Sequence, residues 1–287
     1  MTGSAARIIA FANQKGGVAK TTSTVSIGAA LSELGRRVLL IDLDPQASLT
    51  FSLGMDPDDL EHTIHDVLVG RIPFGKIINQ REEADVAPSN IDLAGAEAYL
   101  LTRTGREFAL RGALDDIMGY YDEILIDCPP SLGVLTLNAL TAADEVVIPL
   151  QCEALSHRGV GMLLETIGDV RRLTNRGLKI GGVLPTMFDT RTKHARQILE
   201  DVGRRYGLPV LEPAIPKTVR FAEAPLRGRS ILKHSSSHPG AAAYRAVARR
   251  LARMPSAPID LDAPAATPPI EDRASVQITP TPSEANE

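Results

Sequence analysis

The stretch Ala10-Phe-Ala-Asn-Gln-Lys-Gly-Gly-Val-Ala-Lys-Thr-Thr22 decides the fold of this 287-residue chain. The apolar run that leads into it, residues 8–11, is typical of a buried parallel strand. The run that follows it, residues 21–34, has apolar side chains at helical spacings. Glycines between a strand and a helix let backbone N–H groups turn towards an anion at the positive end of that helix. The stretch is therefore predicted to be a phosphate-binding loop.

Two residues at the end of this loop carry the expected chemistry. Lys20 is placed to reach the β- and γ-phosphates of a nucleotide, and the Thr21 hydroxyl is placed to bind Mg²⁺. The ordinary P-loop pattern nevertheless fails, because its two glycine positions fall on Gln14 and Ala19. A side chain makes a positive φ costly. We therefore expect the loop at Ala19 to run in a conformation that an alanine can adopt, rather than at a positive φ.

The segment Lys15-Gly-Gly-Val-Ala-Lys-Thr21 resembles the deviant Walker A motif of the ParA/MinD class of ATPases. In that class the early lysine crosses a dimer interface to the partner's nucleotide, so the resemblance implies a catalytic role for Lys15 beside that of Lys20. A glycine-rich turn with incidental lysines is the alternative, and agreement over about ten positions disfavours it. The resemblance implies that the nucleotide is held by Gly16, Gly17, Val18, Ala19, Lys20, Thr21 and Thr22.

A second apolar strand, residues 37–44, ends in two carboxylates and is stopped by Pro45. Strand, loop, helix and strand in succession form a βαβ unit, whose ligands lie beyond the carboxyl ends of the strands. Asp42 and Asp44 are therefore expected on the phosphate side. Residues 40–46 resemble the segment of ParA-type enzymes in which the second aspartate orients the attacking water, which implies a catalytic role for Asp44. Capping of the next helix by Asp44 is an alternative that is compatible with this role.

A third strand, residues 123–126, ends at Asp127, where a carboxylate can accept hydrogen bonds from the waters around Mg²⁺. Asp127 and Thr21 are thus the two predicted magnesium residues. Pro129 and Pro130 delay the next helix, which leaves a loop beside the γ-phosphate, and the Asp-x-Pro-Pro-Ser pattern also resembles ParA. Cys128 is interpreted as a small buried residue.

The rest of the chain continues the alternation of strands and helices, which predicts a doubly wound, mostly parallel α/β sheet with helices on both faces. We expect one P-loop ATPase domain over residues 1–254. The further elements are predicted as strands over 84–87, 144–150 and 179–187 and helices over 63–69, 107–118, 159–173, 192–206 and 241–253.

Charge is distributed unevenly along the chain. The net charge is −4, but residues 255–287 alone carry six acids and one arginine, together with seven prolines. This tail cannot form a core and is expected to be disordered; it is either an inert end or an acidic segment that tempers DNA affinity. Two cysteines, no secretory signal and no apolar run of about 18 residues predict a reduced, cytoplasmic protein that does not span a membrane.

The end of the body is basic, with nine Lys or Arg and one acid, Glu223, between residues 217 and 253. Residues 214–225 resemble the late segment of chromosomal ParA proteins, which implies that Pro216 neighbours adenine, and the family also places adenine contacts near Met187 and Asp189. Arginines on a helix are often only a solvated face. Because the chain has no tryptophan and few aromatic residues here, the basic segment favours sequence-independent phosphate contact over base stacking. The predicted DNA-binding residues are Arg191, Arg220, Arg245 and Arg249.

Together these features predict an ATP- and Mg²⁺-dependent dimeric switch with slow intrinsic turnover. The resemblance implies that the ATP-bound homodimer binds double-stranded DNA on the nucleoid without sequence preference. It also implies that a ParB-type centromere-binding partner stimulates hydrolysis during chromosome or plasmid partitioning. The alternatives are a MinD-like ATPase on a membrane surface, disfavoured because residues 255–287 are acidic and proline-rich, and an ATPase that positions another protein cargo.

Overall fold

The apolar runs of the sequence form six strands that pair in the order β3-β2-β4-β1-β5-β6, every pair parallel. The structure, a computed structural model, describes residues 6–153, 156–189 and 193–253; the predicted tail lies outside them. The predicted doubly wound α/β fold is confirmed. The strands are β1 (Arg7–Phe11), β2 (Val38–Asp42), β3 (Asp85–Ala87), β4 (Glu123–Asp127), β5 (Glu145–Gln151) and β6 (Lys179–Thr186).

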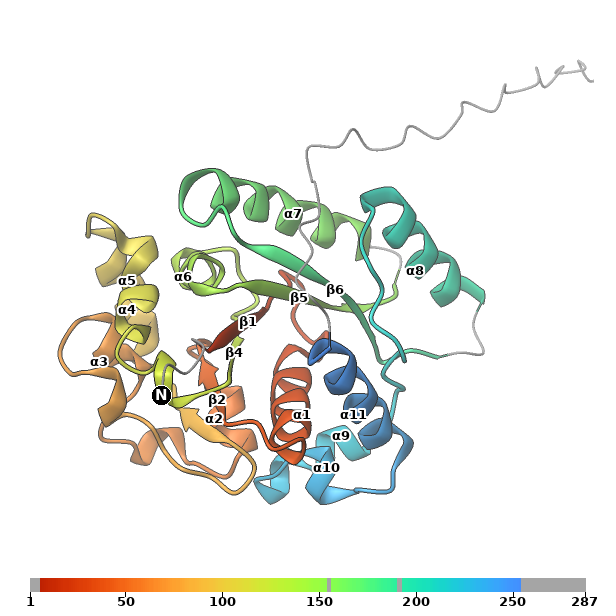
Figure 1. The fold of residues 1–287 in the computed structure, drawn as a ribbon, viewed down its shortest axis with the longest axis horizontal. Coiled ribbons are helices and arrows are strands. Elements are labelled where there is room, and N and C mark those ends of the chain that lie inside the picture. Colours follow the sequence, from red (N-terminus) through yellow and green to blue (C-terminus); the bar gives the residue numbers. More distant parts are fainter. Residues whose placement is uncertain (1–5, 154–155, 190–192, 254–287) are drawn as a thin grey trace, which may run out of the picture.

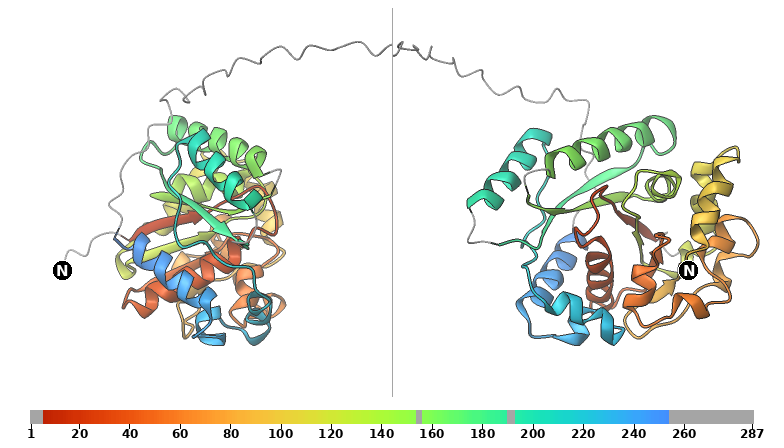
Figure 2. Two further views of the ribbon diagram at one scale, coloured as in Figure 1. Left: turned by 90° about the vertical axis from the view of Figure 1, so that its right-hand side faces the viewer. Right: turned by 180° about the vertical axis from the view of Figure 1, so that it is seen from behind.

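Helices cover both faces of the sheet (Figures 1 and 2). Successive side chains of a strand point to opposite faces, so Ile8 and Ala10 of β1 enter one apolar core while Ile9 and Phe11 enter the other. The first core is completed by α3 (Ile64–Leu68), α4 (Leu93–Leu101), α5 (Ala109–Leu114), α6 (Val134–Ala142), α7 (Ser156–Leu173) and α8 (Lys193–Tyr206). The second is completed by α1 (Lys20–Glu33), α2 (Ser48–Ser52), α10 (Ile231–His234) and α11 (Pro239–Leu251). Within the described residues, no helix is long and apolar enough to cross a bilayer.

One predicted helix, residues 107–118, is wrong. The chain instead forms a 3-10 turn (Arg106–Phe108), the short α5, and a second 3-10 turn (Met118–Tyr120). Gly112, Asp115 and Asp116 are weak helix formers, and α5 ends one residue before the aspartates. The apolar spacing was real, because Leu110 and Leu114 are fully buried, but it belongs to a shorter helix.

The expectation for Ala19 is also wrong. Ala19 has φ 62° and ψ 36°, in the left-handed region, directly before α1 begins at Lys20. The carbonyl of Val18 accepts a hydrogen bond from Thr186 Oγ1 at 2.9 Å, and the Ala19 carbonyl accepts one from Ser23 N at 3.0 Å. These contacts hold the loop in a conformation that costs an alanine about 1–2 kcal/mol.

Positive φ at residues other than glycine occurs at three described positions, Ala19, Ala47 and Met187. They follow β1, β2 and β6, and so all lie at the carboxyl edge of the parallel sheet. Non-glycine residues in the left-handed region cluster where surrounding contacts over-determine the backbone. The carboxyl edge is therefore the strained edge of this fold.

The C-terminal helix is fastened to the helix that follows the loop. The hydroxyls of Ser23 on α1 and Tyr244 on α11 lie 3.0 Å apart in the core. At the other end of α1, Glu33 receives two hydrogen bonds from Arg245, at 2.6 and 2.9 Å. Phe221, on α9 (Arg220–Glu223), packs edge-on against Tyr244 with ring centroids 5.7 Å apart. The basic segments are thus positioned by α1, which starts at the predicted phosphate loop.

Candidate active site

The predicted phosphate loop bridges β1 and α1 and is attached to β5. Asn13, almost fully buried, donates to the carbonyl of Pro149 at 2.7 Å and accepts from the amide of Lys15 at 3.0 Å. Pro149 has no N–H to donate to a neighbouring strand. Because β1 pairs with β5 only as far as Val147, this costs no hydrogen bond between β1 and β5. The sequence interpretation missed Asn13. Its position directly before the loop was the only signal.

Lys20 lies under the loop. Its side chain is only 6% exposed, and its Nζ donates to the carbonyl of Lys15 at 3.2 Å. Burial lowers the pKa of Lys20, against the opposing attraction of Asp127, Cys128 and Asp44. The ammonium group has three N–H donors and uses one of them on this carbonyl. Such a buried cation is suited to binding an anion at the mouth of the loop.

Thr21 and Asp127 meet at the carboxyl edge of the sheet. The Thr21 hydroxyl donates to Asp127 Oδ2 at 2.6 Å, and Thr24 lies 3.5 Å from the other carboxylate oxygen. Asp127 is fully buried, and burial, followed by repulsion from Asp42, raises its pKa well above the usual range. Hydroxyl and carboxylate oxygens are the ligands that Mg²⁺ prefers. A divalent cation beside Asp127 would also offset the cost of its buried charge, so these residues fit a magnesium site.

The two aspartates of β2 have different environments. Asp42 is completely buried and accepts hydrogen bonds from the amide and hydroxyl of Thr50, at 2.9 and 2.8 Å. Burial raises the pKa of Asp42 to about 6, against these hydrogen bonds. Asp44 lies two residues beyond the strand and retains 9% exposure. Asp44 accepts from the Gln46 amide at 2.9 Å and does not cap α2, whose first turn has no side-chain cap.

The Lys15 side chain is directed towards Glu153, just after the end of β5. Its Nζ lies 2.5 Å from Glu153 Oε2, and both side chains are exposed to solvent. The neighbouring Gly16 and Gly17 are also exposed, and Gly17 has φ 71° with nothing near its Cβ position. This corner of the loop is therefore open to a second molecule.

The predicted adenine residues come from two segments that the fold brings together. The amide of Phe188 donates to the carbonyl of Ile215 at 2.9 Å, and Phe188 and Pro216 form a parallel bridge. Met187, with its positive φ, and Asp189 flank this bridge, so these three candidates lie around one junction. Thr186, one residue earlier, binds the phosphate loop through Val18 and was missed by the sequence interpretation.

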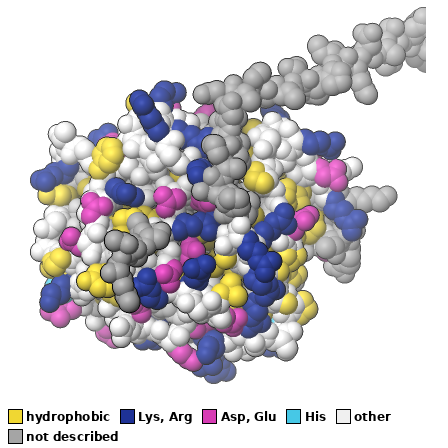
Figure 3. All heavy atoms as spheres, in the orientation of Figure 1, with side chains coloured by type: hydrophobic (Ala, Val, Ile, Leu, Met, Phe, Trp, Pro, Cys, Tyr) yellow, Lys and Arg dark blue, Asp and Glu magenta, His cyan; other side chains and the backbone are white. Residues whose placement is uncertain are grey.

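The predicted DNA residues are dispersed over the C-terminal helices. Arg191 lies outside the described residues. Arg220 is exposed and pairs with Glu223 at 2.7 Å, whereas Arg245 is occupied by Glu33 and Ser236. Arg249 is exposed and makes no ion pair with a described residue. Figure 3 shows Lys and Arg side chains gathered in a band over α11.

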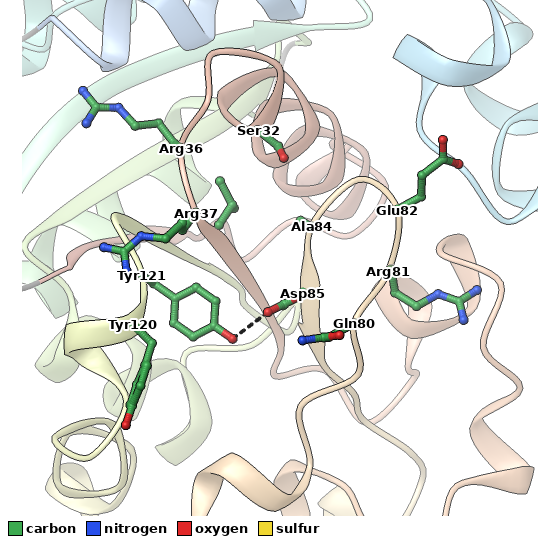
Figure 4. Close-up of a pocket in the computed structure, with 11 residues that line it drawn as sticks. Ser32, Arg36, Arg37, Gln80, Arg81, Glu82, Ala84, Asp85, Tyr120 and Tyr121 are labelled. Carbon is green, nitrogen blue, oxygen red and sulfur yellow. Dashed lines mark hydrogen bonds between the residues drawn. The ribbon is translucent and has the colours of Figure 1, made fainter.

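A cavity of about 430 Å³ lies at the opposite edge of the sheet, where β2 and β3 begin (Figure 4). Within it the Tyr121 hydroxyl donates to Asp85 Oδ2 at 2.8 Å, and burial raises the pKa of Tyr121. Arg37 on its rim is paired with Asp122 at 2.9 Å. Because it is at the amino ends of the strands, this cavity is separate from the phosphate loop.

Comparison with known proteins agrees with this geometry. The AAA_31 family, described as an AAA domain, matches residues 6–180. The sporulation initiation inhibitor protein Soj of Bacillus subtilis is 45% identical over 248 residues, covering 86% of this chain and 98% of Soj. The chromosome partitioning protein ParA of Myxococcus xanthus is 42% identical over 247 residues, covering 85% and 87%.

A solved structure from Mycobacterium smegmatis, named cobyrinic acid a,c-diamide synthase with bound ADP and magnesium, is 55% identical. It has a TM-score of 0.78 and covers 86% of this chain and 94% of that one. The family match covers more than half of the chain, and Soj is matched over nearly its whole length. The chain therefore belongs to the ParA/Soj family of P-loop NTPases.

Proposed function

We propose that this chain is an ATPase that switches between monomer and dimer, binds DNA when ATP-bound, and serves chromosome or plasmid partitioning with a ParB-type partner. The observation that carries the proposal is the constellation of buried Lys20, the Thr21–Asp127 hydrogen bond of 2.6 Å and Asp44 at one edge of the sheet. We take residues 1–254 as the ATPase domain, acting in the cytoplasm on the nucleoid.

Each residue has a distinct role in the proposed hydrolysis of ATP to ADP and phosphate. Residues Gly16 to Thr22 would cradle the phosphates, with the Lys20 ammonium compensating their charge. Thr21 and Asp127 would hold Mg²⁺, which would supply positive charge to neutralise the phosphate oxygens. Asp44, two residues beyond the carboxyl end of β2, would orient the attacking water. We expect the intrinsic turnover to be slow.

Dimerisation is proposed at the exposed corner formed by Lys15, Gly16 and Gly17. Two backbones can approach closely there because no Cβ intervenes. The Lys15 ammonium of each subunit would then compensate charge at the other subunit's phosphates. Adenine would lie near Met187, Asp189 and Pro216, at the junction between β6 and the 215–216 segment.

DNA contact is proposed through Arg191, Arg220 and Arg249, with Arg245 positioning α11. Support comes from the exposure of Arg220 and Arg249 and from the basic band in Figure 3. A dimer doubles the number of phosphate contacts, and affinity for DNA falls more steeply with salt as contacts increase. Binding should therefore be ATP-dependent, independent of sequence and sensitive to salt.

The test is retention on random-sequence double-stranded DNA with ATP, with ADP and without nucleotide, across a salt series. Lys20→Ala is the control, since it removes the buried cation of the loop. Retention that requires ATP, weakens with salt and is lost in Lys20→Ala supports the proposal. Equal or absent retention in every nucleotide state leaves an ATPase with another cargo, such as a membrane surface, which vesicle flotation would detect, or a protein.

A second candidate follows from the name of the M. smegmatis protein, amide synthesis on cobyrinic acid. A glutamine-derived amide requires a reactive cysteine or free ammonia. Burial raises the pKa of Cys128, and it raises that of Cys152 to about 11, so neither cysteine is a ready nucleophile. Phosphate release that depends on cobyrinic acid and ammonia would favour this candidate over the partitioning switch.

A further inference from the structure

Most of the positive charge near the end of the body has no partner there. Of the nine Lys and Arg between residues 217 and 253, four form ion pairs with described acids: Arg220 with Glu223, Lys233 with Glu82, Arg245 with Glu33 and Arg250 with Glu212. The other five are exposed and form no ion pair with any described residue. These five define a basic C-terminal surface: Lys217, Arg227, Arg229, Arg249 and Arg253.

The elements that carry this surface pack against one another. Arg249 and Arg253 lie on and just after α11, and Arg227 ends the 3-10 turn that follows α9. Phe221 of α9 packs against Tyr244 of α11, and a Cβ at Gly240 would lie 2.7 Å from the Phe221 ring. Arg227, Arg249 and Arg253 are therefore carried by elements that pack against one another, and like charges held together in this way repel each other.

The segment that follows Arg253 has the complementary charge. Residues 255–287 hold six acids and one arginine, a net charge of −5 opposite five unpaired cations. The first acid, Asp260, follows Arg253 by seven residues, a reach of about 23 Å. The 13 residues of α11 span about 20 Å. The later pair, Glu271 and Asp272, follows Arg253 by 18 and 19 residues and therefore has a longer reach, about 60 Å.

We propose that residues 255–287 dock on the basic C-terminal surface of their own chain and compete there with external polyanions. A tethered segment acts at an effective concentration in the millimolar range, so weak ion pairs suffice. We expect the contact to depend on charge rather than on a particular order of residues, because attraction between opposite charges acts over several ångströms and needs no single pairing. Where the polyanion is DNA, this inference rests on the function proposed above.

The contact itself is tested without DNA, by zero-length carbodiimide cross-linking of the full chain. Lys217 and Lys233 are the two amines among the nine cations. Lys233 lies 2.5 Å from Glu82 and serves as the internal standard. We expect Lys217 to be joined to tail carboxylates at about 50 mM salt and to lose that link at about 500 mM, where the Debye length falls below about 5 Å. A Lys233–Glu82 product with no Lys217–tail product at low salt would overturn the proposal.

Competition is tested with a full-chain variant in which all six tail acids become amides. Its matched control keeps the composition of the tail but scrambles the order of its residues. We expect the amide variant to bind random-sequence DNA about five- to tenfold more tightly than wild type at low salt, and the scrambled variant to match wild type. Equal affinity of amide variant and wild type would overturn the competition. If no variant binds DNA, the partitioning proposal fails, and the Lys217 cross-link still decides the docking. The substitutions are D260N, D262N, E271Q, D272N, E284Q and E287Q.

Discussion

Lys15 and Glu153 form an ion pair within one chain, with 2.5 Å between Nζ and Oε2, although Lys15 is the residue proposed to serve a second subunit. The pair links the phosphate loop to the end of β5. It must open before Lys15 can reach another molecule. Under the proposed role of Lys15, we expect Glu153 to compete with dimer formation.

The substitution Glu153→Gln should strengthen ATP-dependent dimerisation by about 1.4- to fivefold for each Lys15 released, the range set by an exposed ion pair worth about 0.2–1 kcal/mol. Sedimentation velocity with ATP, in an Asp44→Ala background to slow hydrolysis, measures the association. Glu165→Gln, an exposed carboxylate on α7, is the control and should have no effect. An unchanged association constant in Glu153→Gln would show that the intrachain pair does not restrain Lys15.

Arg220 should contribute to DNA affinity through its positive charge. Arg220→Ala removes one proposed phosphate contact, so retention should weaken equally on all sequences and the salt slope should fall by about 1. Glu223→Gln should act in the opposite direction, because it removes the carboxylate 2.7 Å from Arg220. Filter binding across a salt series measures both. Wild-type affinity in Arg220→Ala would eliminate this residue as a contact.

Ala19→Gly should stabilise the protein by up to about 1 kcal/mol, because glycine adopts a positive φ without the steric cost that alanine bears. Ala30→Gly, at a buried position inside α1, is the control and should lower the free energy of unfolding by at least about 1 kcal/mol. Urea denaturation measures both. A loss of stability in Ala19→Gly would mean that the left-handed alanine is not strained.

Glu123 should make stability depend on pH. Its Oε2 is buried with no hydrogen-bond partner among the described residues, and burial raises its pKa, against the attraction of Arg7 and Arg36. The native state therefore keeps a proton that the unfolded chain releases, so stability falls as pH rises through the interval between the ordinary and the raised pKa. Glu123→Gln should flatten this fall and stabilise the protein by about 1 kcal/mol at pH 7.

The adjacent Asp122 supplies a control of opposite sign. The Arg37 side chain, followed by its amide, lowers the pKa of Asp122 to about 2. Its stabilising contribution is present above the ordinary aspartate pKa and is lost as pH falls towards 2. Asp122→Asn should therefore reduce stability at pH 7. The free energy of unfolding is measured from pH 4 to pH 7 for wild type and Glu123→Gln. If it changes with pH equally in the two proteins, the assignment to Glu123 is contradicted.

Tyr244→Phe should cost about 1 kcal/mol, because the Ser23 hydroxyl in the core loses its partner. Ser23→Ala should cost a similar amount, and the double variant should cost less than the sum. Thermal or urea unfolding of the four proteins completes the cycle. Strict additivity would show that the two hydroxyls do not interact across α1 and α11.

The fold could be predicted where the residues of one strand or helix form a recognisable pattern by themselves. Apolar runs that end in Asp42 and Asp127 gave the strands and their direction, because buried parallel strands are continuously apolar. The helix over 107–118 was not predictable from spacing alone, since Leu110 and Leu114 occupy helical positions in a chain that turns at both ends. The weak helix formers Asp115 and Asp116, directly after α5, outweighed the periodicity there.

The surroundings of the phosphate loop depend on contacts that spacing does not encode. Thr186 binds the Val18 carbonyl across 168 positions of sequence, and Asn13 binds Pro149 across 136. Such contacts fix the left-handed Ala19 and could not be inferred from a local rule that gives alanine a negative φ. The meeting of Phe188 with Pro216 likewise follows only from the path of the folded chain.

The strained carboxyl edge sets a limit on how this protein can be improved by selection. A screen that rewards heat resistance alone would favour glycine at Ala19, Ala47 and Met187, since each has a positive φ. Under the proposed function, such a gain at Ala19 would loosen the loop that holds the phosphates. At these three positions we therefore expect substitutions that raise thermal stability to lower turnover. Engineers seeking a tougher variant should work on the amino edge of the sheet, where strain of this kind is absent among the described residues.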